Sequence, residues 1–60
     1  MVKEGQIRKF INGKLPYFKV ICFVDDRRAW FCMFEEDFYP YQYFHLTKEE
    51  LEEKTELTEE

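Results

Sequence analysis

The chain has 60 residues, a formal net charge of -4 and an aromatic content of 20%. A chain of this length buries only about 60% of the surface that its unfolded form exposes, which excludes several domains and a large core. We therefore expect one small domain over residues 1–60. No apolar stretch is long enough to span a membrane and no signal peptide is recognisable at the start, so we expect no membrane association.

The first strand is predicted over residues 6–11, after a turn at Glu4 and Gly5. Asn12-Gly13 follows, and this dipeptide is typical of a two-residue type I′ hairpin turn because both central residues of that turn need a positive φ. Such a turn would pair Ile7 with Phe18 in the next strand.

The central hairpin is predicted from two apolar runs, residues 17–24 and 29–34, separated by the charged residues 25–28. Aromatic and β-branched side chains dominate both runs, and such side chains suit a strand. A loop of two or four residues at 25–28 fixes the pairing. The predicted pairs are Val24 with Ala29, Cys22 with Phe31, Val20 with Met33, Ile21 with Cys32, and Phe23 with Trp30.

Both faces of this hairpin are largely apolar, because successive side chains of a strand point to opposite faces. A small antiparallel sheet commonly has one apolar and one polar face, so we assign one face to the core and the other to a partner. The predicted core is Ile7, Phe18, Val20, Cys22, Val24, Ala29, Phe31, Met33, Phe44, Leu46 and Leu51. The predicted partner-binding residues are Tyr17, Ile21, Phe23, Arg27, Arg28, Trp30 and Phe34.

A fourth strand is predicted over residues 41–46, after an acidic loop at 35–37 and an aromatic turn at 38–41. Alternation along this strand separates its side chains onto two sides. The first side carries Phe44 and Leu46, and the second carries Tyr41, Tyr43 and His45.

Residues 46–51 contain a helix start. Thr47 can cap the helix and Glu50 can complete a capping box. Leu51 and Leu57 are six positions apart, which does not match one helical stripe, so we predict a helix from residue 48 to about 53 and a closing strand at 55–58. The alternative is a helix that continues, frayed, to residue 60.

This order of elements, with the lead-in KEGQI and the ending LTKEELEEKTEL, resembles small SH3-like β-barrel proteins, many of which bacterial viruses and mobile elements encode. The resemblance covers nearly the whole chain in pattern. It implies a mainly β fold, either a small antiparallel sheet or an SH3-like barrel of four to five strands, with one short C-terminal helix. It also implies a non-enzymatic binder, and it supplies no site residues.

The charge is unevenly distributed, because residues 1–30 carry +4 and residues 31–60 carry -8. A docking face or a solvated acidic helix both account for this asymmetry. Nucleic-acid binding is the alternative function, although the acidic total opposes phosphate binding. The basic and aromatic residues that would serve it are Arg8, Lys9, Lys14, Lys19, Arg27 and Arg28, with Tyr17, Phe23 and Trp30.

Catalysis and metal binding are not indicated. His45 is the single histidine, and the two cysteines, Cys22 and Cys32, lie in apolar strands at irregular spacing from it. Structural zinc usually takes four ligands at tight spacings. We expect no enzyme, no cofactor and no metal, and two free thiols typical of a reducing compartment such as the cytoplasm.

The sequence thus predicts a protein-binding module that modulates a host protein on behalf of a virus or mobile element. The second face of the hairpin would contact this partner, or a second copy in a homodimer. We expect Trp30 to contribute to that contact and not to the core.

Overall fold

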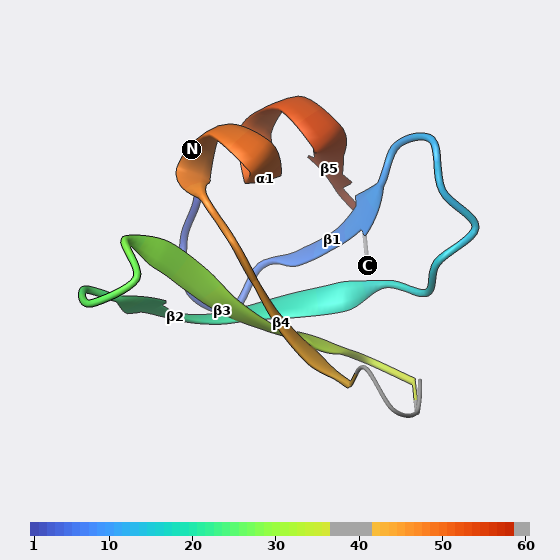
Figure 1. The fold of residues 1–60 in the computed structure, drawn as a ribbon. Helices are drawn as coiled ribbons and strands as arrows, with labels where there is room; N and C mark the ends of the chain where they lie inside the picture. The colour runs from blue at the N-terminus through green and yellow to red at the C-terminus, as the bar shows by residue number, and fades with distance from the viewer. Residues whose placement is uncertain (37–41, 59–60) are drawn as a thin grey trace.

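The computed structural model describes residues 1–36 and 42–58. Within these residues, five strands form one antiparallel sheet, and a short helix precedes the last strand (Figure 1). The elements are β1 (Ile7–Phe10), β2 (Phe18–Val24), β3 (Ala29–Phe34), β4 (Tyr43–Leu46), α1 (Lys48–Lys54) and β5 (Thr55–Leu57). The predicted mainly β fold with one short helix near the C-terminus is confirmed.

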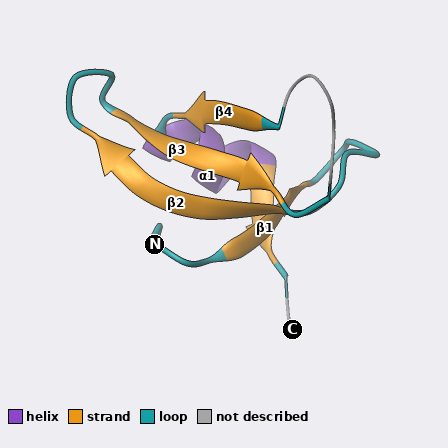
Figure 2. Ribbon diagram, turned by 90° about the horizontal axis from the view of Figure 1, so that it is seen from below, coloured by secondary structure: helices purple, strands orange, loops and turns teal. Residues whose placement is uncertain are grey.

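The strands lie in the order β4-β3-β2-β1-β5, so β1 joins the central hairpin to the last strand of the chain. The helix α1 covers one face of the open sheet, which we call the inner face. Figure 2 views the opposite, outer face and shows β2, β3 and β4 with no described helix or strand in front of them. No helix in the described part of the chain is long and apolar enough to cross a membrane.

The hairpin of β2 and β3 has the predicted loop. Residues 25–28 connect the strands, Val24 pairs with Ala29, and Cys22 pairs with Phe31. Arg28 has a φ of 52°, and its backbone N–H donates to the Asp25 carbonyl at 3.2 Å. The predicted pairing of β2 with β3 is therefore correct for the residues next to the loop.

A β-bulge at Ile21 changes the register farther from the loop. Val20 pairs with Cys32, where Met33 was predicted. Such a bulge leaves one residue unpaired, and a one-residue shift moves the side chains of a strand to the other face. As a consequence, Trp30, Cys32 and Phe34 lie on the inner face with Phe18 and Val20, whereas they were predicted to lie on the opposite face.

The predicted core is wrong at five positions, all on the outer face and only partly buried: Ile7, Cys22, Val24, Phe31 and Met33. It is correct for the buried residues Phe18, Val20 and Leu51 and for Phe44 and Leu46, which pack against the core. Ala29 is buried as predicted, although it lies on the outer face and outside the core cluster. The observed core adds Val2, Cys32 and Phe34, which are buried, and Phe10 and Trp30, which are partly buried.

The predicted Asn-Gly hairpin turn is also wrong. Neither Asn12 nor Gly13, both within the described residues, has a positive φ. Residues 11–17 instead form a loop, which we call loop 11–17, and Arg8 pairs with Phe18. The physical reason is that the Ile11 N–H donates to the Lys54 carbonyl at 3.0 Å, so the chain after β1 continues along the end of α1 and does not fold back at once.

Aromatic rings fill the space between the sheet and α1. The Phe18 ring is fully buried, and its centroid lies 5.2 Å from that of Phe10, 5.1 Å from that of Phe44 and 6.4 Å from that of Phe34. Leu51 of α1 closes this cluster from the helix side. The core is therefore an aromatic cluster under a single helical residue.

The buried Arg8 connects β1 to the end of α1. Its side chain is 6% exposed, and its guanidinium donates to Thr55 Oγ1 at 2.8 Å, to the Leu51 carbonyl at 3.1 Å and to Gln6 Oε1 at 2.9 Å. No ion pair joins it to a carboxylate within the described residues. Burial lowers the pKa of Arg8, and the charge of Glu52 opposes that shift.

The predicted capping box of α1 is confirmed. Thr47 Oγ1 accepts from the Glu50 N–H at 3.1 Å, and the Glu50 carboxylate accepts from the Thr47 N–H at 2.9 Å. The closing strand is confirmed as well, because β5 pairs with β1. The predicted turn at 38–41, the start of the fourth strand at Tyr41 and the end of the chain at 59–60 lie outside the described residues.

We expect Arg8→Ala to lower the free energy of unfolding by about 2 to 4 kcal/mol, because charged hydrogen bonds are lost and the Leu51 carbonyl loses a donor. This is a large part of the roughly 3 to 9 kcal/mol typical of a chain of this size. Urea unfolding measures it. The matched control is Lys9→Ala on the same strand, whose exposed ion pair with Glu56 spans 3.7 Å and contributes less than about 1 kcal/mol. Equal effects of the two substitutions would contradict the role of Arg8.

A second prediction concerns Cys32, whose thiol is fully buried. Burial raises its pKa from 9.0 to about 12. Below pH 9 the thiol is protonated in both states; between about pH 9 and 12 only the unfolded chain releases the proton, which favours unfolding. The difference in unfolding free energy between wild type and Cys32→Ala should therefore shrink as the pH rises from 8 to 10.5 in urea titrations. A difference that stays constant over this range would contradict it.

Candidate functional site

The predicted partner-binding residues do not form one surface. Phe34 is only 4% exposed, and its ring centroid lies 4.7 Å from that of Phe44, so its assignment to an accessible face is wrong. Trp30 packs against the core from the inner face. Both errors follow from the bulge at Ile21 in β2, because the register shift places Trp30 and Phe34 on the same face as the buried Phe18.

Ile21, Phe23, Arg27 and Arg28 lie toward the loop end of the hairpin. Phe23 is 44% exposed and contacts Trp30 edge to face, with ring centroids 5.3 Å apart and an interplanar angle of 66°. Arg27 and Arg28 are exposed in the adjoining loop. Ile21 is partly buried in the bulge.

Tyr17 lies at the opposite end of the hairpin. Its ring is 46% exposed, and its carbonyl accepts from the Glu35 N–H at 2.9 Å. It is therefore accessible, but the structure separates it from the residues near the loop at 25–28.

The outer face carries an aromatic cluster that sequence reasoning assigned in part to the core. The Phe31 and Tyr43 rings stack with centroids 5.3 Å apart and an interplanar angle of 11°, and the Phe31 and His45 rings lie 5.2 Å apart. Met33 pairs with Tyr43 beside them. We call Phe31, Met33, Tyr43 and His45 the outer aromatic cluster.

A signal for this cluster was present in the sequence. The alternation predicted for β4 places Tyr43 and His45 opposite to Phe44 and Leu46, and the structure has this arrangement. Residues that pair across neighbouring strands share a face, so the partners of Tyr43 and His45 on β3 must lie on the outer face too. Knowing the register of β3 with β4 would have identified the cluster.

The basic residues predicted for nucleic-acid binding are dispersed. Arg8 is buried and already bonded to Thr55 and Leu51, so it cannot reach a phosphate. Lys9 forms its ion pair with Glu56. The exposed residues that remain lie on loop 11–17, β2 and the hairpin loop: Lys14, Lys19, Arg27 and Arg28.

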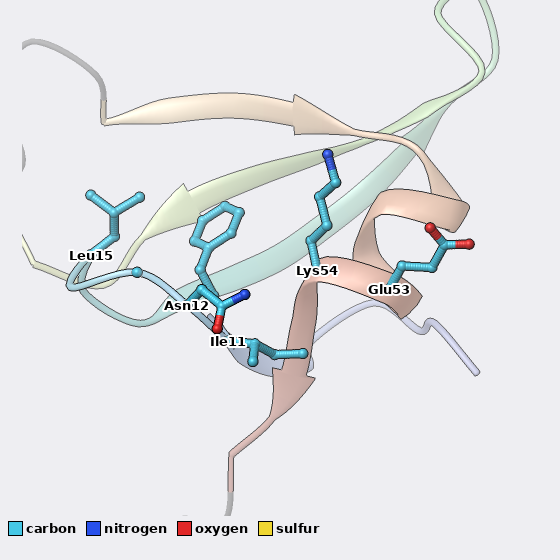
Figure 3. A pocket seen from close by; sticks show the side chains of 7 residues that line it. Ile11, Asn12, Leu15, Glu53 and Lys54 are labelled. Atoms are coloured by element: carbon cyan, nitrogen blue, oxygen red, sulfur yellow. The ribbon is translucent and has the colours of Figure 1, made fainter.

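A groove of about 340 Å³ lies between loop 11–17 and the end of α1. Figure 3 shows Ile11, Asn12 and Leu15 on the loop side and Glu53 and Lys54 on the helix side. Its lining residues are Phe10, Ile11, Asn12, Gly13, Leu15, Glu53 and Lys54. Sequence reasoning missed this groove because it placed Ile11 and Leu15 in paired strands around a tight turn.

The histidine and the buried cysteine lie on opposite faces of the sheet. His45 lies on the outer face against Phe31, while Cys32 is buried on the inner face with its thiol donating to the Trp30 carbonyl at 3.6 Å. Across residues 1–36 and 42–58, no group of three His, Cys, Asp or Glu side chains is placed to hold a metal ion. Both cysteines are free.

Comparison of the chain with protein-family models, curated proteins and solved structures found no match.

Proposed function

We propose that the chain is a small, non-enzymatic protein-binding module whose contact surface is the outer aromatic cluster. The observation that carries this proposal is that the cluster lies on a sheet face that no described helix or strand covers (Figure 2). The open face of an antiparallel sheet is commonly polar, whereas this one carries stacked rings and Met33. Of the cluster, Tyr43 is exposed, and Phe31, Met33 and His45 are partly exposed; accessible apolar side chains gathered in one patch are typical of a site of interaction.

The composition of the cluster suits a protein partner. Aromatic residues and methionine are enriched at protein–protein interfaces, and a few such residues supply most of the binding energy. Tyr43 is 58% exposed, so a partner can remove its ring from water, while the stack on Phe31 already restricts its motion. The cluster therefore offers a rigid apolar contact.

The hairpin loop extends this surface. Val24 and Ala29 pair on the outer face at the start of the loop, and the exposed Arg27 and Arg28 lie between them in the chain. Arginine is frequent among the residues that dominate binding energy. The proposed interface thus has an apolar centre and two arginines at one end.

The nature of the partner is proposed from the resemblance to small SH3-like proteins of bacterial viruses and mobile elements. On that basis the chain acts in the cytoplasm and modulates a protein of the host cell. Fold-level resemblance alone supports this step, whereas the outer aromatic cluster supports the choice of surface.

Tyr43→Ser tests the proposal. We expect it to weaken partner binding at least tenfold, because a dominant interface residue contributes about 2 kcal/mol or more. The free energy of unfolding should change little, because the ring is largely exposed. Partners are captured from nuclease-treated bacterial lysate on immobilised chain, identified by mass spectrometry, and their affinities measured with purified protein.

The matched control is Leu57→Ser, on the edge strand β5 and 55% exposed, which should bind as wild type does. A partner held equally by both variants would refute the assignment of the outer face. A concentration-dependent mass that Tyr43→Ser abolishes would identify the partner as a second copy. Salt-sensitive binding of an oligonucleotide, unaffected by Tyr43→Ser, would favour a nucleic-acid function instead.

A further inference from the structure

We propose that the groove between loop 11–17 and the end of α1 binds the free carboxylate end of a peptide whose last residue is aliphatic. This site is separate from the outer aromatic cluster and does not depend on the function proposed for that cluster.

The groove has the size and lining of a ligand site. Its volume of about 340 Å³ lies within the range of roughly 300 to 1,000 Å³ typical of small-ligand pockets. Ile11 and Leu15 line it while 49% and 42% exposed, and Phe10 joins it to the aromatic core. An aliphatic side chain placed here would remove both exposed side chains from water, which is favourable in proportion to the apolar area buried.

The rim supplies a positive charge without a partner. Lys54 is exposed, and its ammonium makes no ion pair or hydrogen bond with the rest of the described chain. Figure 3 shows it projecting from the end of α1 beside the loop residues. Lys14, also exposed, follows Gly13 of the lining in the chain. A ligand with a carboxylate complements the charge of Lys54, which lines the groove.

Asn12 favours a peptide over a simple fatty acid. Its side-chain amide offers two donors and an acceptor, which match the C=O and N–H groups of a peptide backbone. A hydrocarbon chain would cover the amide without replacing its hydrogen bonds to water, which costs free energy. The polar group within the apolar groove therefore selects a ligand that is itself partly polar.

Two sources of negative charge near the groove disfavour a bound carboxylate, and the structure reduces the effect of each. The end of α1 is the negative end of the helix dipole, but the Leu51 carbonyl accepts from Arg8 and the Lys54 carbonyl accepts from the Ile11 N–H. Glu53 also lines the groove. In Figure 3 it lies on the far side of Lys54, away from the labelled residues of loop 11–17. Glu53 should consequently weaken carboxylate binding, and Lys54 should strengthen it.

The experiment is an NMR titration of the full chain with acetyl-Ala-Leu, with its C-terminal amide, and with octanoate. We expect acetyl-Ala-Leu to shift backbone signals of residues 10–15 and 53–54 and to bind about two- to fivefold more tightly than the amide, the size of a solvent-exposed ion pair. Lys54→Gln should abolish that preference, and Glu53→Gln should increase it. Thermal unfolding of each variant checks that the fold is retained.

The control is Lys48→Gln at the opposite end of α1, which removes the same charge away from the groove and should leave the preference unchanged. Equal affinity of wild type for the acid and the amide would overturn the proposal. An equal loss of the preference for the acid over the amide in Lys48→Gln and Lys54→Gln would also overturn it, because such a loss would reflect net charge alone. Tighter binding of octanoate than of the peptide would overturn the peptide assignment.

Discussion

The hydrogen bonds of the buried Arg8 guanidinium are the interaction on which the arrangement of this small sheet depends. The strand β1 has four residues and pairs with both β2 and β5. Its backbone hydrogen bonds connect it to these strands, and a further contact is needed to hold α1 in place. Arg8 supplies this by donating to Leu51 and Thr55, 43 and 47 positions away in the chain. Burying the charge is costly, and neutral acceptors at the negative end of the helix dipole offset that cost.

This connection determines which surfaces the molecule can present. Because Arg8 holds the end of α1 over the inner face, this helix covers only that face, and no described helix or strand covers the outer aromatic cluster. The same junction brings Ile11 to the Lys54 carbonyl, which directs loop 11–17 past the helix and opens the groove between them. The buried arginine is thereby lost as a phosphate ligand, and the remaining exposed residues of the predicted basic set are divided among loop 11–17, β2 and the hairpin loop.

The aromatic residues divide into an inner set around Phe18, which provides the core, and an outer set around Phe31, which remains for contact. So many rings in so short a chain exceed what one helix can cover, because a small domain has little interior relative to its surface. The open face is the physical consequence of that imbalance, and binding is the use we propose for it.

The sequence by itself determined the features that rest on local interactions: the capping box at Thr47, the loop at 25–28, the alternation of Phe44 and Leu46 on β4, and the closing strand. Tertiary structure decided the features that need contacts between distant segments. The bulge at Ile21 selects which face of β3 is buried, and so decides whether Phe31 or Phe34 is accessible. The Ile11–Lys54 hydrogen bond overrides the local turn preference of Asn12-Gly13. Neither can be read from nearby residues, because each depends on which distant backbone group is available as a partner.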